Sequence, residues 1–99
     1  MLDLARMQNP RNMVGPQVRR LRNERGLSQP ALAGLLQRGG WDISRDTIAK
    51  IEDQRRWVSD FEVAFLAEIL NVPIPELFGN RSRSKKPKEY ILRLERRLS

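Results

Sequence analysis

The chain has 99 residues, with 19 Lys and Arg against 12 Asp and Glu, and a formal net charge of +7. A chain of about 100 residues buries one modest core, so we expect a single small domain with at most a tail. The sequence contains no cysteine and no histidine. Their absence excludes disulfides, zinc sites built from the usual ligands, and Cys- or His-based catalysis.

The apolar pattern offers neither a membrane span nor a secretory signal. The longest uninterrupted apolar run covers residues 63–67, far fewer than the roughly 20 residues that a membrane helix needs. The N-terminus, from Met1 to Leu4, lacks a basic region followed by an apolar core. We therefore expect a cytoplasmic protein with no membrane partner.

The charge is unevenly placed along the chain. Residues 1–79 hold 11 basic and 10 acidic side chains, whereas residues 80–99 hold 8 and 2. Residues 61–79 contain three glutamates and no Lys or Arg. This polarity is typical of a protein with one face toward a polyanion and an acidic face away from it. A solubilising surface that happens to be uneven gives the same pattern.

The first part of the chain predicts an N-terminal arm and one helix. Residues 1–15 are weakly patterned and form the expected arm. Pro16 suits the first turn of a helix and Gly26 its end, while Val18 and Leu21 between them face inward.

Two short helices follow, one over residues 29–38 and one that begins after Ser44. Ser28 and Ser44 stand where N-caps belong, because each hydroxyl can accept from the unpaired N–H groups of a first helical turn. Gly39 and Gly40 break the chain between the helices. Trp41, in the long turn, is expected to cover the end of the core, and sensing of a ligand is its weaker alternative.

The next helix starts at a capping box formed by Ser59 and Glu62. It carries a core stripe and a second apolar stripe at spacing four, which consists of Phe61, Phe65 and Ile69. A short last helix lies within residues 73–79. Residues 80–99 predict a basic linker and an amphipathic helix, whose apolar side carries Ile91, Leu94 and Leu98.

The two unpartnered stripes predict an interface. We expect the final helix to pack on the helix that begins near residue 60, of its own subunit or of a partner, in a two-fold homodimer. The alternative is a tail that is unstructured in isolation and acts as an electrostatic arm.

Three motifs in order carry a resemblance to a known family. They are VRRLRNERGLSQPALA at residues 18–33, SRDTIAKIE at residues 44–52 and FEVAFLAEILNVPIPELFG at residues 61–79. Together they resemble the lambda repressor and Cro family, the Xre-type helix-turn-helix domain. The resemblance implies an all-α, five-helix lambda-repressor-like domain over residues 16–79, to which this chain adds the C-terminal amphipathic helix.

The chain departs from the family pattern at two places. The turn between the two central helices is several residues longer than in the phage repressors. Asp53 and Gln54 stand where the family usually ends its recognition helix with Asn-Gly. Gly adopts positive φ without strain, so Gln54 costs about 1 kcal/mol there or the helix ends differently.

The resemblance also implies which residues bind DNA. Gln29 matches a position that holds a phosphate, and the recognition helix brings to the major groove Ser44, Arg45, Asp46, Ala49 and Lys50. Arg45 and Lys50 can donate to guanine, whereas Asp46 can accept from cytosine or orient Arg45. Arg55 and Arg56, just after this helix, are candidates for phosphate contacts. By resemblance, Arg22 should form a structural ion pair with Glu52. For each DNA-binding candidate, and for Arg22, the alternative is an ordinary solvated surface position.

These expectations combine into one function and an alternative. We expect a double-stranded DNA-binding transcriptional regulator that acts as a homodimeric repressor at the nucleoid, with no cofactor and no metal. The alternative is an adaptor that uses the same fold to bind a protein partner, in the manner of a coactivator or an antitoxin. An enzyme is a distant third, because no pair of carboxylates lies in a recognisable pocket motif.

Overall fold

The computed structural model describes residues 9–79. The expectations for the N-terminal residues 1–8 and for the C-terminal linker and helix, with Ile91, Leu94 and Leu98, lie outside the described residues.

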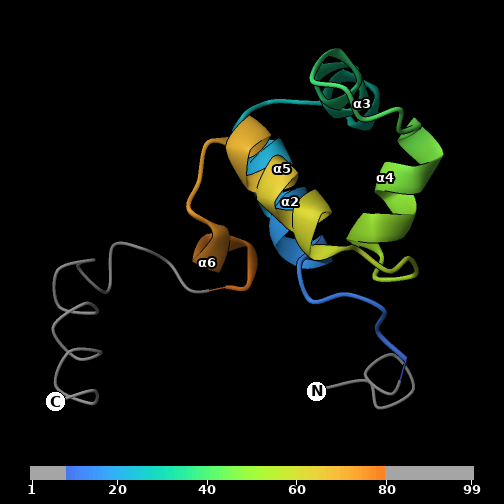
Figure 1. The fold of residues 1–99 in the computed structure, drawn as a ribbon, viewed down its shortest axis with the longest axis vertical. Helices are drawn as coiled ribbons and strands as arrows, with labels where there is room; N and C mark the ends of the chain where they lie inside the picture. The colour runs from blue at the N-terminus through green and yellow to red at the C-terminus, as the bar shows by residue number, and fades with distance from the viewer. Residues whose placement is uncertain (1–8, 80–99) are drawn as a thin grey trace, which may run out of the picture.

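The described residues form an all-helical domain, as the sequence predicts. Its elements are α2 (Gly15–Glu24), α3 (Gln29–Arg38), α4 (Arg45–Glu52), α5 (Asp60–Leu70) and α6 (Ile74–Leu77). Helix α2 contacts α4, α5 and α6, while α3 contacts α4 and α5. In Figure 1, α4 and α6 lie on opposite sides of the α2–α5 pair, and the turn after α3 leads down into α4. Helices α3 and α4 are thus the helix-turn-helix unit.

Three of the helices start at the predicted serine caps. The hydroxyl oxygens of Ser28, Ser44 and Ser59 each accept from the backbone N–H three residues later, at 3.1 to 3.2 Å. Glu62 completes the predicted capping box by accepting from the backbone N–H of Ser59 at 2.9 Å. These caps satisfy donors that no helix can satisfy internally, so they fix where each helix begins.

All five described helices end in the same way, with a residue of positive φ just after the helix. The residues and their φ angles are Gly26 (67°), Gly40 (108°), Gln54 (62°), Asn71 (57°) and Gly79 (89°). After α4, the backbone N–H of Gln54 donates to the carbonyl of Ile51 at 3.0 Å, and the backbone N–H of Arg55 donates to the carbonyl of Lys50 at 2.8 Å. This pair of bonds defines a Schellman motif. Gln54 therefore adopts a positive φ, the conformation for which glycine was expected, and it carries the associated strain.

The core lies where α2, α3, α4 and α5 meet. Its most deeply buried side chains are Val14, Val18, Leu21, Leu32, Leu36, Ile48, Ile51, Leu66, Leu70 and Leu77. Val14 is only 1% exposed and α2 begins at Gly15. The packed domain therefore begins slightly before the expected boundary at residue 16, and residues 14–15 belong to it.

The long turn after α3 closes one end of the core. Ile43 is buried, and Trp41 packs partly buried against the core, as expected. The Trp41 ring meets Phe65 edge to face, with centroids 6.1 Å apart and planes at 78°. Gly39 lies so close that a Cβ there would be 2.5 Å from Cζ of Phe65. The extra residues of the turn thus pack on α5.

Candidate nucleic-acid interface

Helix α4 has one side in the core and one side in solvent. Ile48, Ile51 and Glu52 are buried, and this fixes the rotation of the helix about its axis. Three of the predicted groove residues, Arg45, Asp46 and Lys50, are exposed, and Ala49 between them is half-buried. A small residue at that position lets a ligand surface approach the helix closely.

The exposed side chains of α4 hold one another only weakly. Arg45 Nη1 lies 3.5 Å from Asp46 Oδ1, and both side chains are largely exposed, so this pair contributes little. Ser44, also exposed, has its hydroxyl within 3.1 Å of Thr47 Oγ1 in addition to its cap bond. Asp46 therefore lies where it can orient Arg45, one of its two expected roles.

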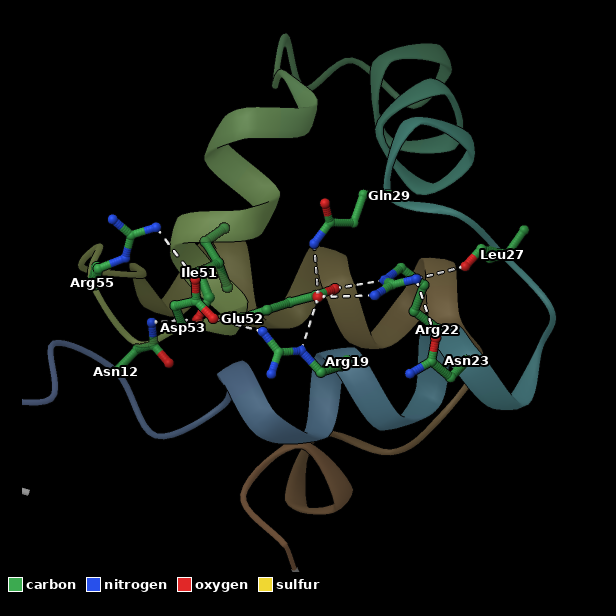
Figure 2. A network of polar contacts seen from close by, with 10 residues as sticks. All are labelled: Asn12, Arg19, Arg22, Asn23, Leu27, Gln29, Ile51, Glu52, Asp53 and Arg55. Atoms are coloured by element: carbon green, nitrogen blue, oxygen red, sulfur yellow. Dashed lines mark hydrogen bonds and ion pairs between the residues drawn. The ribbon is translucent and has the colours of Figure 1, made fainter. Parts of the chain in front are cut away.

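A buried carboxylate, Glu52, joins α4 to α2 and α3 (Figure 2). Arg22 of α2 meets it with two bonds, Nε to Oε2 at 2.7 Å and Nη2 to Oε1 at 3.0 Å. Gln29 donates to Oε1 at 3.1 Å and Arg19 at 3.4 Å. The predicted partners Arg22 and Glu52 are thus brought together, and Arg22 also donates to the carbonyl of Leu27 at 2.8 Å.

The network keeps Glu52 ionised. Burial raises the pKa of its carboxyl, but hydrogen bonds from Arg22 and Gln29, and the positive charge of Arg22, outweigh burial and hold the pKa below its ordinary value. Glu52 is 2% exposed, and within residues 9–79 every buried side-chain N and O atom has a hydrogen-bond partner. A buried carboxylate with this many donors fixes how α4 sits on the domain.

Gln29 differs from expectation. Its side-chain amide, expected at a phosphate, donates inward to Glu52 instead. The reason is the position of Gln29 at the first turn of α3, directly above the carboxylate. Pro30 has no N–H and the N–H of Ala31 donates to the Ser28 hydroxyl, so any anion contact in this turn would come from the backbone N–H of Gln29.

Arg56 also differs from expectation. Its guanidinium forms two bonds to Glu62, at 3.0 and 3.1 Å, and one to the carbonyl of Trp57 at 2.9 Å. It lies 5.9 Å from the Trp41 ring. The hydrogen bond from Arg56 lowers the pKa of Glu62, against the effect of burial. Arg56 thus ties the loop after α4 to the start of α5.

Unlike Arg56, Arg55 has its side chain in solvent. It is exposed, and its Nη2 lies 3.3 Å from Asp53 Oδ2. Asp53 is held more closely by Arg19, at 2.6 Å. The hydrogen bond from Arg19 is the main cause of the lowered pKa of Asp53. One carboxylate is therefore shared by two arginines at the C-terminal end of α4.

Asn12, which matches none of the sequence motifs, anchors the segment before α2 to this end of α4. Its amide donates to the carbonyls of Ile51 at 3.1 Å and Arg56 at 2.8 Å. Its Oδ1 accepts from the N–H of Gly15 at 2.8 Å. The side chain of Gln54 donates back to the carbonyl of Asn12 at 3.0 Å. The bond to the Gly15 N–H is a local contact of the kind that Asn side chains form in turns, but the long-range contacts of Asn12 leave no mark in the sequence.

The second stripe of α5 is only partly exposed. Phe61 is 83% exposed, but Phe65 and Ile69 pack partly buried against the core. Trp41 and Gly39 cover Phe65 from the turn. The expectation of a fully unpartnered stripe is wrong for Phe65, because the long turn supplies its partner.

A comparison with protein families gives the class of this chain. The family described as "Helix-turn-helix domain" matches residues 14–77, which is more than half of the chain. The chain belongs to this helix-turn-helix domain family, in agreement with the resemblance to the lambda repressor and Cro family. No match was found among curated proteins or solved structures.

Two further searches concern residues 9–79 alone. None of the helices described there is long and apolar enough to cross a membrane. The same residues contain no group of three or more acidic side chains placed to hold a metal ion.

Proposed function

We propose that this chain binds double-stranded DNA in a sequence-specific manner and represses transcription as a homodimer. The exposed side of α4 is the observation that carries the proposal. It presents Arg45, Asp46 and Lys50 to solvent, while the opposite side is fixed to α2 and α3 through Glu52. A helix held rigidly with polar side chains outward is what reading of a major groove requires.

The roles of the exposed side chains follow from their donors and acceptors. Arg45 and Lys50 donate to the O6 and N7 atoms of guanine. Asp46 orients Arg45 or accepts from the amino group of cytosine. Arg55 contacts a phosphate beside the groove and carries no sequence preference. Ala49 allows the helix to lie deep in the groove.

Selection of bound sites from a random duplex pool tests the proposal. We expect a consensus, and we expect Arg45→Ala or Lys50→Ala to cost about 1–3 kcal/mol on the selected site and to relax its sequence. Arg20→Ala is the matched control, because Arg20 lies on α2 and pairs with Glu24 and Glu76, away from α4. Equal losses on all duplexes for Arg45→Ala and Lys50→Ala would show that α4 does not read bases.

The salt dependence of binding provides a second test. Each phosphate that Lys or Arg neutralises releases counterions, so log K falls with log salt by roughly 0.9 per phosphate. An affinity that is the same at low and moderate salt would exclude DNA as the target.

The dimer and its location are further parts of the proposal. One helix reads only a few base pairs, so a small regulator gains specificity by placing two copies on half-sites about one helical turn apart. Phe61, with most of its ring in solvent, is the described residue that best suits such an interface. A regulator of this kind acts at the nucleoid, in the cytoplasm.

An adaptor that binds a protein is the second candidate, and one surface favours it. Gly39, Gly40, Trp41, Phe61, Glu62 and Phe65 line a shallow groove at the start of α5. Aromatic side chains at such a surface are typical of protein interfaces. Two results together would favour the adaptor. No duplex consensus would be selected, and a protein partner would bind independently of salt and lose its binding in Phe61→Ser.

A further inference from the structure

A basic groove lies beside α4, between the segment before α2 and the loop after α4. We define it by its lining residues, which are Asn9, Pro10, Arg11, Lys50, Arg55 and Trp57. All six residues are exposed, and the lining includes three cations and no carboxylate. Of these residues, only Lys50 and Arg55 were expected from the sequence to bind DNA, and the exposed side chains of Arg11 and Trp57 have no role in the domain's core.

The two walls of the basic groove are fixed to each other. The backbone N–H of Arg11 donates to the carbonyl of Gln54 at 2.9 Å. The amide of Asn12 donates to the carbonyl of Arg56 at 2.8 Å, and Gln54 donates to the carbonyl of Asn12 at 3.0 Å. A ligand therefore meets a groove that is already formed, and little ordering of the backbone opposes its binding.

The charges in the basic groove are available to an anion. The ion pairs of residues 9–79 include neither Arg11 nor Lys50. Among these residues, Asp53 alone pairs with Arg55, at 3.3 Å, and Asp53 is held more closely by Arg19 at 2.6 Å. An incoming phosphate can replace this weak exposed contact at small cost.

Trp57 adds a flat apolar surface to these charges. Its side chain is 71% exposed, which is unusual for so large a ring. An indole presents an apolar face and one N–H donor. This combination suits a sugar–phosphate chain, because a deoxyribose packs on the ring while the phosphates meet the cations and the N–H.

We propose that the basic groove holds the sugar–phosphate backbone of duplex DNA next to the base pairs that α4 reads, with Arg11 and Arg55 on phosphates and Trp57 against a deoxyribose. The proposal rests on the proposed function. Lys50 connects the two surfaces, because it lies on the exposed side of α4 and also lines the groove. The strand whose bases meet α4 thus continues along Arg11 and Trp57, and the segment before α2 becomes part of the DNA interface.

The fluorescence of Trp57 tests the contact directly in the full chain. Trp41→Phe keeps an aromatic ring against Phe65 and leaves Trp57 as the only tryptophan, since the chain has two. We expect a duplex of random sequence to change the Trp57 emission in a saturable way at low salt. Inorganic tripolyphosphate at equal phosphate concentration should not. An unchanged emission with bound duplex, or an equal response to tripolyphosphate, would overturn the proposal, the latter in favour of a small-anion site.

The salt dependence of duplex binding tests the cations. Arg11→Ala and Arg55→Ala should each reduce the slope of log K against log salt by about 0.9, and Arg20→Ala should leave the slope unchanged. Trp57→Ala should weaken all duplexes by the same factor with no change in urea unfolding, because the ring is exposed. If Arg11→Ala leaves the salt slope unchanged while Arg45 and Lys50 still read bases, the proposed role of the basic groove is overturned and the proposed function stands. No binding of any duplex by the wild-type chain would overturn both.

Discussion

Gly15 lies directly against the backbone carbonyl of Ile51, where the start of α2 meets the end of α4. A Cβ at Gly15 would overlap the carbonyl oxygen of Ile51 and lie 2.9 Å from that of Glu52. The neighbouring atoms are backbone atoms of a helix that is held by its own hydrogen bonds, so they cannot move aside cheaply. The absence of a side chain at residue 15 therefore sets how closely α4 approaches α2.

We predict that Gly15→Ala destabilises the domain by about 1–3 kcal/mol, the usual range for overpacking. Gly34→Ala is the matched control. Gly34 lies inside α3, and the nearest atom to an added Cβ is 3.9 Å away, on the flexible Arg38 side chain. Alanine there should stabilise the domain by about 0.5–1 kcal/mol. Urea unfolding followed by circular dichroism measures both, and a Gly15→Ala variant as stable as the wild type would contradict the close contact.

Substitutions of Gln54 measure the free-energy cost of a residue with positive φ at the end of α4. Gln54→Gly should be almost neutral, because relief of strain of about 1 kcal/mol is offset by loss of the hydrogen bond to Asn12. Gln54→Ala loses the hydrogen bond but keeps the strain, so it should destabilise the domain by about 1 kcal/mol. Equal unfolding free energies for the two variants would mean that the backbone relaxes away from positive φ.

The sequence predicted the features of this domain that depend on local chemistry. Ser28, Ser44 and Ser59 mark helix starts because a cap bond joins residues only three apart. The break at Gly39 and Gly40 ends α3 for an equally local reason. The Arg22–Glu52 contact was expected from resemblance alone, because nothing local links residues 30 positions apart.

The sequence could not predict which partner a long polar side chain selects. Gln29 and Arg56 have the residue types of phosphate contacts, yet each meets a nearby glutamate in the folded chain. Several partners compete for such side chains, and tertiary placement decides among them. Phe65 was misjudged for the same reason, since its partner Trp41 lies in the irregular turn.

Asp53 should weaken the binding of DNA. It places a carboxylate beside Arg55 and Arg19, near the proposed path of the phosphates. We predict that Asp53→Asn raises affinity on all duplexes about two- to fivefold, the effect of about 0.5–1 kcal/mol from an exposed charge. Fluorescence anisotropy at several salt concentrations measures the change. Glu68→Gln removes the same charge from the exposed surface of α5 and should have a smaller effect. A loss of affinity for Asp53→Asn would show instead that Asp53 positions Arg55 for its contact.

Acid should unfold the domain through its paired carboxylates. The pKa values of Glu52, Asp53 and Glu62 all lie below their ordinary values. Their contribution to stability is therefore complete above the ordinary carboxyl pKa of about 4 and is lost as the pH falls below it. Glu52→Gln should reduce this loss, because an amide at this position cannot titrate, although the variant starts from a lower stability. Urea unfolding between about pH 6 and pH 2.5 measures the unfolding free energy of the wild type and of Glu52→Gln. Parallel plots of this free energy against pH would show that the Glu52 pKa is not lowered.

We expect the proposed homodimer to depend on residues 80–99, the segment that follows α6. Residues 80–99 carry 8 basic and 2 acidic side chains together with Ile91, Leu94 and Leu98. Phe61 on α5 is the most exposed of the described large apolar side chains. If these apolar side chains form the two-fold interface, removal of residues 80–99 should lower affinity for a full palindrome far more than for a half-site, and sedimentation should show a shift toward monomer. Phe61→Ser should likewise lower affinity for the full palindrome more than for the half-site and shift the mass toward monomer. It should not reduce fold stability, because the Phe61 ring is exposed. A truncated chain that keeps its mass and loses affinity equally on both duplexes would instead make the basic segment an electrostatic arm.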